Sequence, residues 1–163
     1  MIVVADTSPI NYLVLIGHIE ILPCFYGRIL IPPTVWEELQ DANTPDQVRA
    51  WIAQAPDWLE KRTLSHAPDA SLDFLDRGER EAIALAEQLG ADRMIIDETL
   101  ARGEAQRRKL SVIGTLGVLR NAARAGLLSL PEALSELQKT SFYVAPELIR
   151  SLLEEEVSRR KKA

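Results

Sequence analysis

The chain has 163 residues, of which 47% are hydrophobic and 26% are charged. This length supports one substantial core but not two independent cores of ordinary size, so we expect a single domain spanning residues 1–163. The net charge of -5 argues against a simple electrostatic nucleic-acid binder, because affinity for phosphate comes largely from Lys and Arg. A nucleic-acid substrate would therefore require bound cations and a local basic patch.

Cysteine usage and hydropathy indicate a cytoplasmic protein without a membrane segment. The single cysteine, Cys24, has no partner for an internal disulfide and no second thiol for a zinc ribbon. The apolar runs are short, and the amino terminus lacks the pattern of a secretory signal. The two histidines, His18 and His66, have no partner at metal-ligand spacing, so imidazole chemistry has little support.

Four short apolar runs, each followed by a turn or a helix-start signal, predict strands of a parallel sheet. They are residues 2–5, 28–31, 94–96 and 110–113. Helical patterns separate them, and this alternation is typical of a parallel sheet covered on both faces. We therefore predict an α/β protein, a three-layer α/β/α sandwich with a central parallel sheet of about four or five strands.

Two regions lie outside this alternation. From about residue 41 to 76, prolines interrupt the pattern, and we expect a helical flap or clip with Trp51 and Trp58 as anchors in short helices. Beyond the predicted core of about residues 1–120, residues 121–163 are expected to form a helical extension. Pro131 and Pro146 are expected in the opening turns of its helices.

Asp6 and Asp97 each follow a predicted strand. The carboxyl ends of parallel strands form the rim of the sheet where ligands bind, so the two carboxylates would meet at one edge. The alternative for both is a local role as the cap of the helix that follows. Two acids at one edge repel each other without a cation between them, so we favour a functional pair.

Glu79 lies on an otherwise apolar helical face. The predicted helix from about residue 78 to Gly90 places Ala82, Ile83 and Ala86 on its apolar stripe, and Glu79 belongs to the same stripe. A buried acid needs a partner or a metal, although pairing with the helix dipole remains an alternative. Glu81 falls nearer the helix flank, but it could take the position instead.

Glu37 and Glu38 are adjacent on the helix that follows the second strand. In a capping box from Thr34 to Glu37, the Glu37 side chain would bind the backbone amide of Thr34. Glu38 would then be free to project over the same edge of the sheet. An error of one residue in the helix start would exchange the two roles.

Four acids, Asp6, Glu38, Glu79 and Asp97, are thus expected at one edge of the sheet. Oxygen ligands alone suit Mg²⁺ or Mn²⁺. Such ions activate water, offset phosphate charge and stabilise the oxyanions of an in-line displacement, which is the chemistry of phosphodiester cleavage.

Five segments together resemble the PIN-domain family, and within it the toxin-like branch related to VapC ribonucleases. They are residues 3–9, 31–39, 75–86, 95–98 and 114–119, with the sequences VVADTSP, IPPTVWEEL, LDRGEREAIALA, IIDE and GTLGVL. Each segment is weak alone, but their order is fairly specific. The resemblance implies a parallel-sheet α/β/α fold, a Mg²⁺ or Mn²⁺ site and endonucleolytic cleavage of RNA.

The family's acidic quartet falls on Asp6, Glu38, Glu79 and Asp97, and a hydroxyl of Thr7 or Ser8 is implied to orient the first acid. Two positions depart from the family pattern. The third acid is a Glu where many relatives have Asp, and the fourth region lacks the usual Thr-x-Asp form, so that Glu98 could share the role of Asp97. A toxin-like protein is also expected, by resemblance, to pair with a small protein antitoxin and to form a homodimer.

Ser8 and Arg102 are the predicted substrate contacts, the latter because it follows Asp97 on the next helix. The basic residues 107–109 have a simpler explanation, because cations at the end of a helix interact favourably with the helix dipole. The main rival prediction is a catalytically silent PIN-like module that binds a protein or nucleic-acid partner. Two others are a flap- or DNA-directed nuclease and a receiver- or phosphatase-like domain, but the latter needs acid and lysine positions that are not visible.

Overall fold

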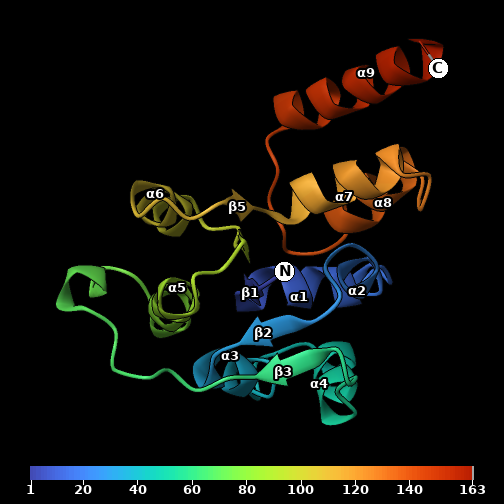
Figure 1. Cartoon of the computed structure of the whole chain (residues 1–163). Coiled ribbons are helices and arrows are strands. Elements are labelled where there is room, and N and C mark those ends of the chain that lie inside the picture. The colour runs from blue at the N-terminus through green and yellow to red at the C-terminus, as the bar shows by residue number, and fades with distance from the viewer. Residues whose placement is uncertain (163) are drawn as a thin grey trace. The chain divides into compact units, whose positions relative to one another are not determined.

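The computed structural model describes residues 1–162 (Figure 1). The strands are β1 (Val3–Ala5), β2 (Ile29–Ile31), β3 (Leu59–Lys61), β4 (Arg93–Ile95) and β5 (Val112–Ile113). The helices are α1 (Thr7–Leu15), α2 (Ile21–Tyr26), α3 (Pro33–Glu38), α4 (Asp46–Ala53), the 3₁₀ turn η1 (Ala70–Leu72), α5 (Arg77–Leu89), α6 (Thr99–Arg107), α7 (Thr115–Arg124), α8 (Leu130–Gln138) and α9 (Pro146–Lys162). The chain divides into two compact units, Met1–Thr115 and Leu116–Ala163.

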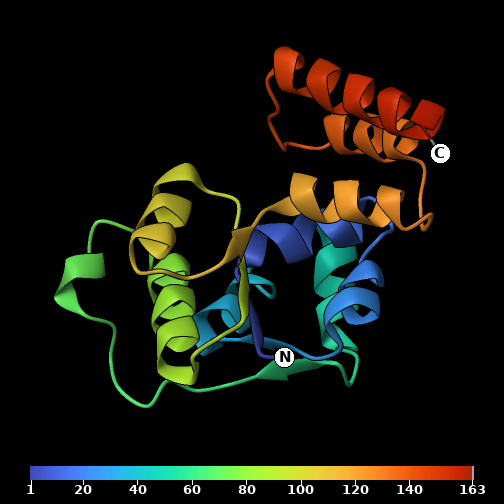
Figure 2. The ribbon, with the colours of Figure 1, turned by 45° about the horizontal axis from the view of Figure 1, so that its top comes forward.

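The first unit is built on a parallel sheet. Within residues 1–115 the sheet has five strands in the order β3-β2-β1-β4-β5, and every neighbouring pair is parallel. Figure 2 shows α5 and α6 on one face of this sheet and α1, α2 and α4 on the other. The predicted α/β/α sandwich is therefore confirmed.

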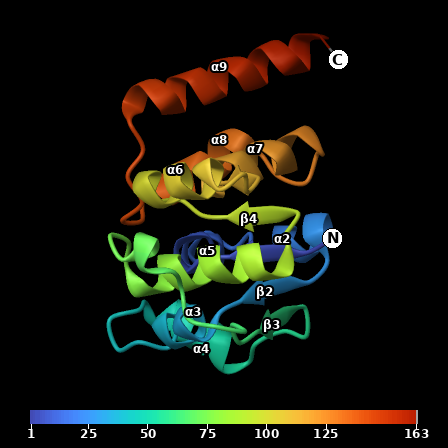
Figure 3. The ribbon, with the colours of Figure 1, turned by 60° about the vertical axis from the view of Figure 1, so that its left-hand side comes forward.

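The central strands β1 and β2 form because their residues are apolar, mostly β-branched and buried on both faces. All residues of both strands are buried, as expected where helices cover the two sides of a parallel sheet. On one face α5 packs against β1 and β4 through the buried side chains of Ala82, Ile83 and Ala86. Figure 3 shows α5 with the sheet behind it. Gly90 ends this helix in the left-handed conformation, as the sequence pattern predicts.

The strand β3 corrects the prediction for the middle of the chain. Residues 59–61 pair with β2 at the edge of the sheet, where we expected irregular helical structure. Trp51 does lie in a short helix, α4, but Trp58 lies in the turn before β3, with its ring 5.9 Å from that of Trp51. An edge strand has a mixed polar pattern, and its pairing with β2 is not encoded locally, so the sequence did not reveal it.

The predicted capping box at Thr34 is also wrong. Helix α3 begins at Pro33, with Pro32 as the capping residue, so Thr34 lies inside the helix. Its hydroxyl donates to a carboxylate on another helix, Glu81 of α5, and not to the start of its own helix. Proline is well suited to a first helical turn, and with Pro33 in that turn the helix starts two residues earlier than predicted.

The second unit is helical, as predicted for the carboxy-terminal part of the chain. Pro131 lies in the first turn of α8, and α9 begins at Pro146, so both proline predictions are confirmed. Helix α8 packs against α9, and Arg124 of α7 pairs with Glu155 of α9. Among residues 1–162, no helix combines the length and the apolar character needed to cross a membrane.

Candidate metal-dependent nuclease site

The carboxyl ends of β1 and β4 bring two predicted site residues to one edge of the sheet. Ala5 pairs with Ile95, so Asp6 and Asp97 follow adjacent parallel strands. The Asp6 amide donates to the carbonyl oxygen of Ile95 at 2.9 Å and extends the ladder to the first acid. Neighbouring strands lie about 5 Å apart, so side chains that leave their ends together are close in space.

Asp6 is buried and does not cap α1. It occupies the capping position of this helix, but its side chain makes no capping hydrogen bond, and it is only 6% exposed. The pKa of Asp6 is raised to about 7, mainly by burial; the charges of Asp76, Glu38 and Asp97 contribute to the rise, and the Thr7 amide opposes it. The capping alternative is therefore wrong for Asp6.

Glu79 is the second buried acid, with an exposed fraction of 8%. Burial raises its pKa well above the usual range, as do a hydrogen bond with Asp76 and the charges of Asp76 and Asp6. Glu81 has a different role, because its two oxygens accept hydrogen bonds from the amide and the hydroxyl of Thr34, at 3.2 and 2.6 Å. Glu79 thus lies near Asp6, whereas Glu81 joins α5 to α3.

The other two acids are held by the residues that follow Asp6. The Thr7 hydroxyl donates to Glu38 at 3.0 Å, and the Ser8 hydroxyl donates to Asp97 at 3.1 Å. The expectation that one of these hydroxyls orients Asp6 is therefore wrong. Ser8, predicted to contact substrate, instead has its hydroxyl on Asp97. Asp97 also accepts from the amide and the hydroxyl of Thr115, both at 2.7 Å.

Burial raises the pKa of Asp97 and of Glu38, and the hydrogen bonds from these hydroxyls oppose the rise. All four predicted acids therefore have a raised pKa. None of the four forms a salt bridge with any residue from 1 to 162. Such carboxylates need another source of positive charge in order to ionise together.

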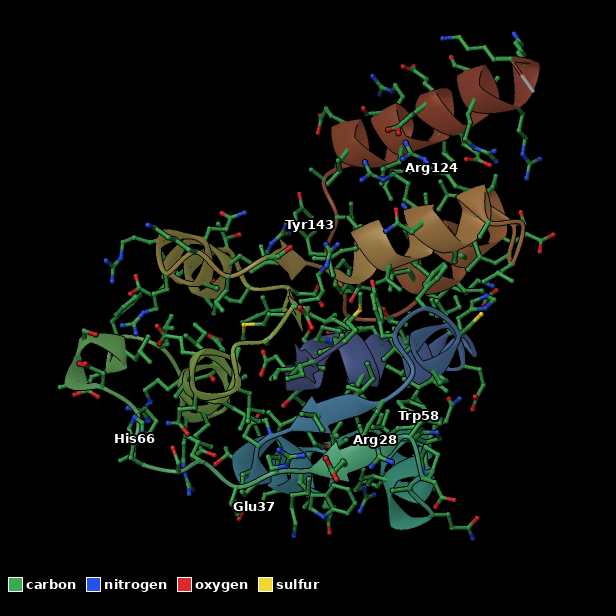
Figure 4. All side chains as sticks on the ribbon, viewed as in Figure 1. Arg28, Glu37, Trp58, His66, Arg124 and Tyr143 are labelled. Atoms are coloured by element: carbon green, nitrogen blue, oxygen red, sulfur yellow. The ribbon has the colours of Figure 1, made fainter. Side chains whose placement is uncertain are left out.

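The neighbouring acids Glu98 and Glu37 accept no hydrogen bond from Thr7 or Ser8, although the charge of Glu98 raises the pKa of Glu79. Glu98 caps α6 by accepting from the Ala101 amide at 2.9 Å, which explains why Asp97 is not needed as the cap. Glu37 is exposed, and Figure 4 shows it on the outer side of α3. Glu38, not Glu37, is therefore the acid of this helix that faces Thr7.

Two glycines allow the acids to approach the backbone closely. A Cβ atom on Gly78 would lie 2.0 Å from Oε1 of Glu38, and one on Gly114 would lie 2.9 Å from Oδ1 of Asp97. The same position on Gly114 is 3.3 Å from Nη1 of Arg102, so this guanidinium lies beside Asp97. The positive charge of Arg102 also lowers the pKa of Asp97.

Asp76 belongs to the acidic group, and the sequence prediction missed it. Its side chain accepts from the Glu79 amide at 2.9 Å and caps α5. Its charge raises the pKa of Asp6, Glu38 and Glu79. The spacing of Asp76 and Glu79, three residues apart at a helix start, is a capping signal, and it indicates a helix start and not a metal site. Asp76 also lines a groove of about 400 Å³, together with Thr34, Glu37, Glu38, Asp41 and Arg77.

The donor set fits a hard divalent cation by its chemistry. Among residues 1–162, no three His, Cys, Asp or Glu side chains already surround one point closely enough to hold an ion. The four acids Asp6, Glu38, Glu79 and Asp97 nonetheless supply oxygen ligands, are buried or half-buried, form no salt bridge with the described residues and have raised pKa values. Mg²⁺ and Mn²⁺ match such ligands.

Comparison with known proteins identifies the family. A family model described as a PIN domain matches residues 2–157. The chain belongs to the PIN-domain family. PIN domains are generally nucleases that use divalent metals.

The fold of this PIN domain also occurs in a solved structure. A PilT N-terminus domain protein from the hyperthermophilic archaeon Sulfolobus solfataricus P2 is similar with a TM-score of 0.51 and 17% sequence identity. The similarity covers 89% of this chain and 100% of the archaeal chain, and at this identity it supports the fold alone. A search of curated proteins gave no match.

Proposed function

We propose that this PIN domain is a cytoplasmic Mg²⁺- or Mn²⁺-dependent endoribonuclease that hydrolyses RNA phosphodiester bonds at Asp6, Glu38, Glu79 and Asp97. The observation that carries the proposal is the burial of Asp6 and Glu79 without a cationic partner among the described residues. Structural stability alone would favour a hydrophobic side chain at either position. A cation-binding role explains why both positions are acids.

The four acids divide into two pairs in the proposed site. Asp6 and Glu79 hold the main ion, and Glu38 and Asp97 complete or position a weaker site. When bound, such ions supply activation of a water molecule and neutralisation of the phosphate charge. The Thr7 and Ser8 hydroxyls keep Glu38 and Asp97 in place through their hydrogen bonds.

Arg102 is the proposed contact to the RNA backbone. Its guanidinium lies beside Asp97 and forms no salt bridge with residues 1–162, so its donors remain available to a phosphate. It also supplies positive charge to a protein whose net charge is negative.

The biological setting is proposed from the resemblance to the VapC-like branch. The protein would act as the toxin of a toxin–antitoxin pair, bound by a small protein antitoxin and assembled as a homodimer. Co-purification with the product of an adjacent small gene and a measured molar mass would test these two assignments.

The function is tested by incubating purified protein with RNA in the presence and absence of divalent ions. We expect cleavage with Mg²⁺ or Mn²⁺, none with excess chelator, and none by Asp6→Asn at an unchanged circular dichroism spectrum. Asp57→Asn is the matched control, because Asp57 is exposed and lies outside the acidic group. Cleavage by Asp6→Asn or in chelator would exclude the proposed mechanism.

A wild-type protein that cuts no RNA would favour the catalytically silent module instead. Binding of the metal can then be examined separately from the substrate. Diffraction from a crystal soaked in Mn²⁺ should show anomalous density between Asp6 and Glu79 under the proposal, and its absence at saturating Mn²⁺ would argue against a metal site.

A further inference from the structure

Most cations of the first unit are already neutralised. Among the Lys and Arg side chains of residues 1–115, those that form no salt bridge with any described residue are Lys61, Arg93, Arg102 and Lys109. An unpaired cation retains its full charge for an external anion, whereas a paired one has lost much of it. These residues are therefore the candidates for contacts with phosphate.

Only two of the unpaired cations lie at the carboxyl edge of the sheet, where the acids are. Lys61 is the last residue of β3 and pairs with Ile31, the last residue of β2. Arg102 lies near the start of α6, beside Asp97. Arg93 begins β4, and Lys109 follows the end of α6, so both belong to the opposite edge.

Lys61 and Arg102 flank the acids. In the sheet order β3-β2-β1-β4-β5, Lys61 is on β3, Asp6 follows β1 and Arg102 accompanies the end of β4. Two strand spacings, about 10 Å, separate β3 from β1. At that distance Lys61 would contact a phosphate next to the one at the carboxylates, and not the same one.

The position of the Lys61 ammonium is partly fixed. It lies 5.5 Å from the centre of the Trp36 ring, on α3, the helix that also carries Glu38. A cation over an aromatic face is held without being neutralised, because the ring has no net charge. The arrangement therefore keeps an accessible positive charge at a defined distance from the acids.

We propose that Lys61 and Arg102 bind backbone phosphates on opposite sides of the scissile one, so that a single-stranded nucleic acid crosses the strand ends from β3 towards β5. This inference rests on the proposed nuclease function for the location of the scissile phosphate. It adds a second phosphate contact, Lys61, and the direction in which the strand runs over the sheet.

The test compares four charge-removing variants, Lys61→Met, Arg102→Met and, as matched controls from the opposite edge, Lys109→Met and Arg93→Met. The probe is a fluorescein-labelled single-stranded RNA of about 12 nucleotides, within the range of single-strand site sizes. Fluorescence anisotropy measures the Kd of the RNA at several salt concentrations between about 50 and 200 mM. The binding buffer contains Ca²⁺ in place of Mg²⁺, because Ca²⁺ is a hard cation that carboxylate ligands bind in flexible geometry.

We expect Lys61→Met and Arg102→Met each to reduce the slope of log K against log salt by about 0.7, the value for one phosphate contact on a single strand. The double variant should lose about twice as much, and the two controls should keep the wild-type slope. A DNA oligonucleotide of the same sequence should show the same losses, because the contacts are to phosphate. Under turnover with Mg²⁺, Lys61→Met should raise KM and leave kcat unchanged.

A Lys61→Met slope equal to that of Lys109→Met would overturn the inference, even if the protein cleaves RNA. Conversely, the slope of log K against log salt could fall only in the Lys61 and Arg102 variants while the wild type never cleaves RNA. That result would support the proposed binding path and reject the nuclease function. Failure of the wild type to bind either oligonucleotide would reject both, because an active site for single strands must bind them.

Discussion

At the scale of single residues, three consecutive side chains organise the acidic group. Asp6 is buried at the end of β1, and the next two residues donate hydroxyl hydrogen bonds to Glu38 and to Asp97. The partners come from opposite neighbours of β1 in the sheet, β2 with its helix α3 and β4. One short turn thus fixes two acids that are far apart in the sequence.

Gly78→Ala should move Glu38 without unfolding the protein. A Cβ at this position would overlap Oε1 of Glu38, and the flexible end of the Glu38 side chain can shift away. The change should lower cleavage about 10- to 100-fold, the order of loss for a catalytic group displaced by about 1 Å. Steady-state cleavage rates and thermal unfolding would measure the two effects.

Gly103→Ala is the control for this prediction. Gly103 also lies in a helix, α6, but nothing lies within 4 Å of its added Cβ. Both variants gain helix propensity, about 1 kcal/mol relative to glycine, so stability should be kept or increased in each. Equal activities of the two variants would show that the close approach of Glu38 to Gly78 has no functional role.

At the scale of elements, Glu81 and Thr34 join α5 to α3. The carboxylate of Glu81 accepts hydrogen bonds from both the amide and the hydroxyl of Thr34, and Nε of Arg77 lies 3.4 Å from Oε2, the oxygen that accepts from the hydroxyl. The helix that carries Glu79 is therefore tied to the helix that carries Glu38. This contact accounts for an acid that the sequence offered as an alternative metal ligand.

Thr34→Val keeps the shape of the side chain and removes the hydroxyl donor. Loss of a buried hydrogen bond to a carboxylate should lower the free energy of unfolding by about 1–3 kcal/mol, measured by urea denaturation. Thr63→Val, at an exposed position, should change it little. A double-mutant cycle with Glu81→Gln should give a coupling energy above zero, and additive effects would contradict a direct contact.

At the scale of the whole molecule, the raised pKa values make stability depend on pH. The pKa of Asp6 is about 7 in the folded state against 3.8 for the free group, so between these values the folded state binds more protons than the unfolded state. The free energy of unfolding should therefore fall as pH rises through this window, by up to about 4 kcal/mol for Asp6. Glu79, Glu38 and Asp97 shift in the same direction.

In chelator, Tm should be higher near about pH 5 than near about pH 8, because the buried carboxylates are protonated at the lower value. Mn²⁺ should raise Tm mainly at the higher pH, since metal binding requires deprotonated ligands. In Asp6→Asn, both the change of Tm with pH and the rise of Tm with Mn²⁺ should be smaller. Differential scanning fluorimetry across this range provides the measurement, and a wild-type Tm that is insensitive to pH in chelator would contradict the raised pKa values.

The sequence by itself determined the features that depend on local patterns. Apolar runs ending at Asp6 and Asp97 specified strands and a common edge, and an acid on the apolar face of α5 singled out Glu79. These signals lie within one strand or helix, where side-chain periodicity reports burial directly. They were enough to predict the α/β/α sandwich and to select the candidate acids.

Only the tertiary structure decided the features that depend on contacts between distant segments. The edge strand β3, the hydroxyl partners of Glu38 and Asp97, the Glu81–Thr34 contact and the place of Asp76 among the acids each join elements far apart in the chain. A local pattern gives such residues a sufficient local explanation, such as a cap or a loop. Their second role arises only when folding brings another element within hydrogen-bonding or electrostatic reach.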